Sequence, residues 1–209
     1  MTRRALCKGL DQLIVEGTDD RAFINALVQR RLGVDIVAPK LIKTRDDGGG
    51  ASWALSEFAE QLKTPRPTAR VGLVLDRDAA ANDNLPRVRA QLESVAARVR
   101  DGAIHDGQFG IWMWPDNASY GDLEDLVLSM AGSSPLLEHA ATSTRHARSG
   151  LTAEYRESDE RKATLKVRSI WLDAARAAGY GHLVHRLDLA DTPGTRSFLE
   201  WFERLFLTE

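Results

Sequence analysis

The 209-residue sequence has one cysteine, Cys7, and lacks any long hydrophobic run. A single cysteine excludes an intramolecular disulfide and a zinc site built from several thiolates. The longest apolar runs are far shorter than the roughly 20 residues that a transmembrane helix needs. No apolar segment follows Arg3 and Arg4, as it would in a signal peptide. These absences predict a cytoplasmic protein with no membrane partner.

Neither sign of charge dominates the chain. The 28 Lys and Arg residues nearly balance the 30 Asp and Glu residues, which gives a formal net charge of −2. This balance argues against a surface that is basic all over, although a local basic groove for nucleic acid stays open. The length suits one large domain, or one domain with a small appendage.

Short apolar runs alternate with helical patterns along the first half of the chain. The predicted strands span 13–15, 34–42, 71–75 and 109–114, and helices are predicted between them at 18–30, 52–62 and 85–99. Thr18 is expected to cap the first helix. Segment 71–75 is apolar on both faces, which is typical of a central parallel strand. The alternation predicts an α/β fold in which a mostly parallel four-stranded sheet is flanked by helices.

The second half of the chain is predicted to be helical. Helical patterns cover 123–130, 135–147, 162–178 and 195–207, and the polar stretch 142–159 is the expected mobile connection. We therefore predict an α/β core over residues 1–130 and a helical extension over 131–209. The extension is expected to pack on the core, so that the chain forms one compact domain.

Three acidic residues lie at the ends of predicted strands. Glu16 ends the first strand, Asp76 ends the third, and Asp78 follows shortly after it. Ligands of parallel α/β sheets collect outside the carboxyl ends of the strands. If the chain stays extended, Asp76 and Asp78 point to the same side. Any one of these residues is explained by a helix cap or a turn, but three together repel one another and need a cation or basic partners. Carboxylate oxygens suit Mg²⁺ or Mn²⁺.

Four segments carry a resemblance to a known family. Ile14-Val15-Glu16-Gly17, followed by Asp20, resembles the first motif of TOPRIM domains, and Leu75-Asp76-Arg77-Asp78 resembles their Asp-x-Asp motif. The segments 110–117 and 121–126 are similar to those of small, stand-alone and uncharacterised relatives of the OLD-type (overcoming lysogenization defect) nucleases. With the helical tail around Lys162, the resemblance covers nearly the whole chain.

The resemblance implies a divalent-metal-dependent nuclease, or a related phosphotransferase, that acts on nucleic-acid phosphodiesters. It implies metal ligands at Glu16, Asp20, Asp76 and Asp78, with Glu124 or Asp125 completing a second metal site. Glu16 is also the implied general base, and Lys162 would neutralise charge that develops on the phosphate oxygens. For Lys162, a solvated position on a helix is an equally good interpretation.

The implied partner is nucleic acid, with DNA favoured over RNA. The OLD-type nucleases carry an ATPase domain, but this sequence has no Gly-x-x-x-x-Gly-Lys-[Ser/Thr] motif for ATP. Any ATPase partner would therefore be a separate protein that acts in trans. Arg45, beside the Gly48–Gly50 loop, is the candidate for a contact with substrate phosphate.

Other interpretations stay open at this point. The same fold could bind a nucleic acid or a protein without turnover. A phosphatase-like hydrolase with Asp76 as its nucleophile is a third hypothesis, since such enzymes place an Asp after a strand. Trp112 and Trp114 share one face of a strand, where they would either stack on bases or fill the core. Core packing is the favoured interpretation.

Overall fold

The computed structural model describes residues 5–6, 11–37, 40–45, 49–63, 69–95, 108–151, 153–173, 179–186 and 191–208. In chain order its elements are β1 (Ala5–Leu6), β2 (Gln12–Val15), α1 (Thr18–Leu32), β3 (Ile42–Lys43), α2 (Gly50–Lys63), β4 (Val71–Asp76), η1 (Ala80–Asn82), α3 (Leu85–Val95), β5 (Phe109–Trp114), α4 (Leu123–Ala131), α5 (Pro135–Gly150), η2 (Glu157–Asp159), α6 (Glu160–Leu172), α7 (Tyr180–Arg186), α8 (Pro193–Phe206) and β6 (Leu207–Thr208).

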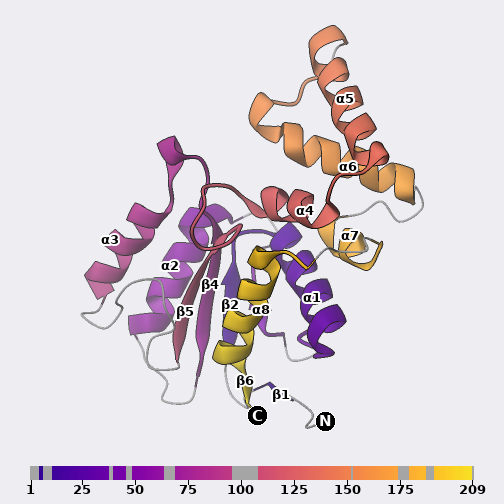
Figure 1. The fold of residues 1–209 in the computed structure, drawn as a ribbon. Coiled ribbons are helices and arrows are strands. Elements are labelled where there is room, and N and C mark those ends of the chain that lie inside the picture. The colour runs from indigo at the N-terminus through magenta and orange to yellow at the C-terminus, as the bar shows by residue number, and fades with distance from the viewer. Residues whose placement is uncertain are drawn as a thin grey trace.

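A four-stranded parallel sheet in the order β3-β2-β4-β5 forms the centre of the fold. The short strands β1 and β6 form a separate antiparallel pair. Helices α2 and α3 lie on one side of the sheet and α1 and α8 on the other (Figure 1). The α/β class and the parallel sheet flanked by helices, which the sequence pattern predicted, are confirmed.

Side chains of the sheet alternate between two hydrophobic cores, as the two-residue period of a strand requires. The core that α1 and α8 cover receives Leu13, Val15, Val74, Trp112 and Trp114. The core that α2 and α3 cover receives Ile14, Val71, Leu73, Leu75, Ile111 and Met113. Burial on both faces explains why the central strands are apolar without alternation.

The two tryptophans of β5 are core residues, as favoured from the sequence. Trp112 and Trp114 are 3% and 0% exposed. Their ring centroids lie 5.5 and 4.8 Å from that of Phe198 on α8. Helix α8 therefore closes one face of the sheet, and it does so from the far end of the chain.

The predicted strand over 34–42 was wrong in length, because only Ile42 and Lys43 pair with β2. A turn precedes them: the N–H of Lys40 donates to Val37 O at 3.0 Å, and Asp35 Oδ1 accepts from the N–H of Val37 at 2.9 Å. Lys40 also has a positive φ of 54°. The backbone reverses direction here, so it cannot run as an extended strand.

The expected cap of the first helix was also wrong. Thr18 is the first residue of α1, and Gly17 occupies the capping position. The Asp20 carboxylate reaches back and accepts the Gly17 N–H at 3.1 Å. An acidic side chain at this point of a helix satisfies an otherwise unpaired donor and suits the helix dipole.

The helical half of the chain differs from the prediction in three places. Helix α5 continues to Gly150, so much of the stretch expected to be mobile is helical, and it packs against α6. Helix α6 ends at Leu172, and the rest of the predicted helix up to 178 lies mostly outside the described residues, as do the residues predicted to extend α3 to 99. A separate helix, α7, packs on α1.

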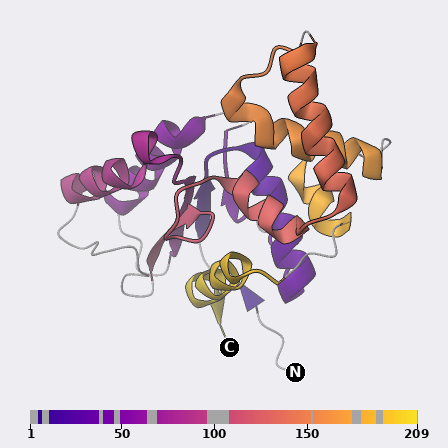
Figure 2. The same cartoon turned by 45° about the horizontal axis from the view of Figure 1, so that its top comes forward.

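The part of the chain expected as an extension contributes in two ways. Helices α5 and α6 form a hairpin above the carboxyl ends of the strands, as the turned view also shows (Figure 2). Helices α7 and α8 instead return to the α/β core, where Tyr180 and Phe202 are fully or almost fully buried. None of the described helices is long and apolar enough to cross a membrane.

The position of α8 yields a stability prediction. Phe202→Ala removes a side chain that is 0% exposed and should lower the free energy of unfolding by about 3–5 kcal/mol. Glu200→Ala, at an exposed position of the same helix, should change it by no more than about 0.5 kcal/mol. Urea denaturation measures both. Similar values for the two variants would show that α8 does not belong to the cooperative core.

Candidate metal centre

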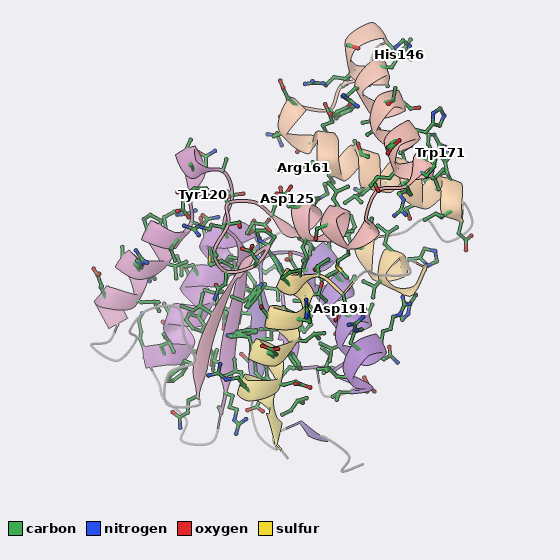
Figure 3. All side chains as sticks on the ribbon, in the orientation of Figure 1. Tyr120, Asp125, His146, Arg161, Trp171 and Asp191 are labelled. Atoms are coloured by element: carbon green, nitrogen blue, oxygen red, sulfur yellow. The ribbon has the colours of Figure 1, made fainter. Side chains whose placement is uncertain are left out.

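Five acidic residues gather at the edge of the sheet where β2 and β4 end. A cavity of about 270 Å³ is lined by Glu16, Asp19, Asp20, Asp76 and Glu124, and Lys162 lines it too. Strands β2 and β4 pair in parallel with Val15 opposite Val74, so Glu16 and Asp76 follow at the same edge. Helix α1 supplies Asp20, and α4 supplies Glu124. Helix α4 and the loop that precedes it are visible above the strands (Figure 3).

Burial and mutual repulsion make Asp76 and Asp20 reluctant to ionise. Burial raises the pKa of Asp76 well above its usual value, and the carboxylates of Asp20, Glu16 and Glu124 raise it further. Burial also raises the pKa of Asp20, to about 7, and Glu16 adds to this effect. Each has neutral donors: Asp76 Oδ1 accepts the Leu123 N–H at 2.9 Å, and Asp20 Oδ1 accepts the indole N–H of Trp114 at 3.0 Å.

Glu16 is the member of the cluster whose hydrogen bonding is incomplete. Its Oε2 is buried and has no hydrogen-bond partner in the described part of the chain. Burial raises the pKa of Glu16 and the nearby Asp78 carboxylate raises it further, against the lowering effect of backbone donors at Asp76 and Ala51 and of the Arg87 charge. A buried carboxylate oxygen without a partner is costly, so this atom calls for a cation or a donor from outside the chain.

Asp78 does not continue the extended chain, so the condition under which it was expected to point the same way as Asp76 is not met. Its φ is 64°, and it forms an isolated bridge with Gly121. Its Oδ2 accepts a hydrogen bond from Asn84 Nδ2 at 2.8 Å. Asp78 lines a second cavity of about 290 Å³, whose wall also includes Glu124 and Lys162. Asp78 thus acts on Glu16 through its charge, from the neighbouring cavity.

Of the two acidic candidates on α4, Glu124 faces the cluster and Asp125 does not. Glu124 is 8% exposed and lines both cavities. Both carboxylate oxygens of Asp125 bind Arg161, at 2.8 and 2.9 Å. Arg161 also binds Asp122 at 2.7 Å. This ion-pair group fixes the hairpin to the start of α4.

Lys162 lies at the cluster rather than in bulk solvent. Its Nζ is 3.5 Å from Asp19 Oδ2 and 3.9 Å from Glu124 Oε1. Burial alone lowers the pKa of Lys162, but Glu124 and Asp19 outweigh this and raise it above its ordinary value. Lys162 therefore stays positively charged. Arg45 has an exposed side chain and is not among the described residues that line either cavity.

Sequence reasoning missed Tyr180, which is 1% exposed and donates to Glu124 Oε1 at 2.7 Å. A Cβ on Gly181 would lie 2.7 Å from the Ala22 carbonyl oxygen, and Gly179 has a φ of 80°. These glycines let α7 sit directly on α1 and insert the phenol. The Gly-Tyr-Gly segment was the available sequence signal, but a turn explains it equally well.

The donors present fit a hard cation that keeps part of its water shell. No group of three or more His, Cys, Asp and Glu side chains within the described ranges is placed to hold one metal ion by itself. Mg²⁺ commonly uses only one or two carboxylates and retains several waters. The unpartnered Glu16 oxygen and the buried Asp76 carboxylate suit that mode. That Glu16, Asp76 and Asp78 share one cation stays a prediction.

Comparison with protein families gives one match, over residues 11–207, to a family described as "Protein of unknown function (DUF3226)". The chain belongs to the DUF3226 family. The match spans every element from β2 to α8, so both the carboxylate cluster and the helical hairpin lie within the DUF3226 region. No curated protein and no solved structure matches the chain. The chemistry of this DUF3226 member must therefore be argued from its own residues.

The Tyr180 contact predicts a stability difference between two tyrosine variants. Tyr180→Phe removes a hydrogen bond to a carboxylate and should cost about 1.5–3 kcal/mol, because bonds to charged groups are the stronger ones. Tyr155→Phe is the matched control, since the Tyr155 hydroxyl donates to the neutral Thr144 carbonyl at 2.5 Å. It should cost about 0.5–1.5 kcal/mol. Urea denaturation at pH 7.5 compares them, and an equal loss would show that the bond to Glu124 is no stronger than a bond to a neutral carbonyl.

The raised pKa values predict how stability varies with pH. An Asp with an ordinary pKa of 3.8 releases its proton in the unfolded chain, whereas Asp20 holds its proton up to about pH 7 in the folded protein. The folded state thus binds more protons in this window, so metal-free stability should fall as pH rises from about 4 to 7. Asp76→Asn keeps the bond from Leu123 and removes one repelling charge. It should show a smaller fall and a higher melting temperature above pH 7.

Thermal melts in a chelator at several pH values test this expectation. Parallel curves for the wild type and Asp76→Asn would mean that the cluster is not under electrostatic strain.

Proposed function

We propose that the chain is a divalent-metal-dependent enzyme that cleaves or transfers phosphodiester bonds of nucleic acid. The observation that carries the proposal is the buried carboxylate cluster at the ends of β2 and β4, in which Glu16 Oε2 has no partner among the described residues. Lys162 is the cation placed against this cluster. Buried carboxylates that repel one another destabilise the folded state, so a cluster of them favours a functional role such as cation binding.

Glu16 and Asp76 would hold the ion, Mg²⁺ or Mn²⁺, with Asp20 and Glu124 beside it and Asp78 in the adjoining cavity. When bound, such an ion lowers the pKa of a coordinated water and stabilises the leaving oxygen. Glu16 is placed to accept a proton, because burial and Asp78 raise its pKa. Lys162 stays positively charged and is placed to pair with a phosphate oxygen.

Tyr180 and Trp114 serve the site by orienting carboxylates. Each donates one hydrogen bond, Tyr180 to Glu124 and Trp114 to Asp20. Both side chains are buried at 0–1% exposure, so they cannot turn away without disturbing the core. Rigid support of this sort holds ligands in a productive geometry.

The resemblance to TOPRIM domains supports the same proposal at the level of motif order. It also supports DNA rather than RNA as the substrate and an ATPase that acts in trans. A cytoplasmic location agrees with the lone cysteine and with the absence of a membrane-spanning helix among the described elements. A module that binds nucleic acid without turnover is the alternative function.

Metal binding predicts a difference between wild type and Asp76→Asn in thermal melts. Mn²⁺ at about 100 times its Kd should stabilise the wild type by about 2.7 kcal/mol. It should stabilise Asp76→Asn far less, because the amide keeps the shape but not the charge. Glu138→Gln, at an exposed position on α5, is the isosteric control and should respond like the wild type. Equal shifts in all three proteins would remove Asp76 from the site.

A cleavage assay with single- and double-stranded DNA and RNA completes the test. Wild type and Glu138→Gln should cleave one of these substrates with Mn²⁺, and Asp76→Asn should not. A metal-induced shift without cleavage of any substrate would favour the binding module.

A further inference from the structure

An aromatic side chain stands exposed at the edge of the sheet that carries the carboxylates. Tyr120 is 53% exposed and lies between β5 and α4. It is seen above the upper end of the sheet, as are Asp125 and Arg161, whereas Trp171 and His146 lie out on the hairpin (Figure 3). An exposed tyrosine alone needs no explanation. The contacts that support Tyr120, however, do call for an explanation.

The loop that carries Tyr120 is held by its own hydrogen bonds. Asp116 Oδ1 accepts the N–H groups of Ala118 and Ser119 at 3.0 and 2.6 Å, and its Oδ2 accepts the Ser119 hydroxyl at 2.9 Å. The Asn117 N–H donates to Met113 O at 2.7 Å. The backbone on both sides of the ring therefore has a defined course, in contrast to an ordinary exposed loop.

A guanidinium supports one face of the ring. Arg77 lies 4.7 Å from the ring centroid of Tyr120. The Arg77 side chain is only 15% exposed, and it also pairs with Asp83 at 3.5 Å and donates to the Ala118 carbonyl. Arg77 is thus fixed from two sides. A cation held on one face of an aromatic ring orients the ring and leaves the opposite face to solvent.

The ring is joined directly to the candidate metal centre. Gly121, which follows Tyr120, forms a bridge with Asp78, which follows Arg77, through hydrogen bonds of 2.8 and 3.0 Å. Asp78 lines the second cavity, which shares Glu124 and Lys162 with the first. The backbone beside Tyr120 is therefore linked through Gly121 and Asp78 to the second cavity, which adjoins the first at Glu124 and Lys162.

We propose that Tyr120, supported by Arg77, is a stacking platform for an unpaired base of the nucleic-acid substrate. This rests on the proposed function and adds its substrate class: single strands, or duplex ends with an unpaired nucleotide. A base on the free face of Tyr120 would bring its sugar-phosphate chain toward the second cavity, whose wall holds Lys162 and Arg161 beside the acidic residues Asp78, Asp122, Glu124 and Asp159. A base inside a duplex has no free face to offer, so the platform selects against continuous duplex.

Binding of fluorescein-labelled dT10 and of a blunt duplex of the same length, followed by anisotropy with Ca²⁺, tests the platform. The wild type should prefer the single strand. Tyr120→Ala should weaken single-strand binding about 5- to 100-fold, the range for loss of one base stacked on an aromatic ring. Tyr120→Phe should keep binding within about twofold, because it retains the ring.

Trp171→Ala is the matched control, since Trp171 is 44% exposed and stacks on His139 with centroids 5.2 Å apart. It is not among the described residues that line either cavity. Its loss should leave binding unchanged. A single 2-aminopurine moved along the strand gives a direct readout of stacking. Its fluorescence should be quenched at one position in the wild type and Tyr120→Phe, and not in Tyr120→Ala.

The outcomes separate the platform from the proposed function. Unchanged binding and quenching in Tyr120→Ala overturns the platform, even where the wild type cleaves DNA with Mn²⁺. Tyr120-dependent binding without any cleavage supports the platform and overturns the nuclease. A wild type that binds neither strand nor duplex overturns the platform together with the nucleic-acid function.

Discussion

Repulsion among buried carboxylates is the constraint around which the upper edge of this sheet is built. Asp76 and Asp20 both have raised pKa values because they are buried and because their neighbours carry the same charge. The fold offsets this cost with donors of several kinds: a backbone N–H for Asp76, an indole for Asp20 and a phenol for Glu124. Glu16 Oε2 has no partner among the described residues, and this is the physical reason why we propose a cation here.

The supporting groups come from the most deeply packed parts of the molecule. Trp114 packs edge-on against Phe23 and lies beside Phe198, while its N–H holds Asp20. Tyr180 enters through a helix that two glycines allow to sit directly on α1. Packing of the aromatic core thus also fixes the donors that hold the mutually repelling acidic side chains in place, as is expected of functional sites.

The helical hairpin is attached to the site by ion pairs as well as by apolar packing, in which the fully buried Leu165 of α6 joins the core that α4 and α7 share. Arg161 binds Asp122 and Asp125, and burial, Glu124 and Asp125 raise the pKa of Asp122 to about 6 despite the guanidinium. These ion pairs place the next residue, Lys162, close to Glu124 and Asp19. Because the pKa of Asp122 is raised, burial and the neighbouring carboxylates outweigh the guanidinium, and Arg161 offsets only part of the acidic repulsion at the start of α4.

Much of this arrangement follows from local sequence. Apolar runs that alternate with helical patterns determine a parallel sheet, and a parallel sheet places Glu16 and Asp76 at one edge because its strands end on the same side. The tertiary structure alone decided the rest. Asp78 leaves the extended course of β4 with a positive φ and lines the neighbouring cavity, Glu124 rather than Asp125 faces the cluster because Arg161 holds Asp125, and Tyr180 arrives from α7. These choices depend on contacts between segments far apart in the chain, and periodicity records only which face of an element is apolar, not which partner will cover it.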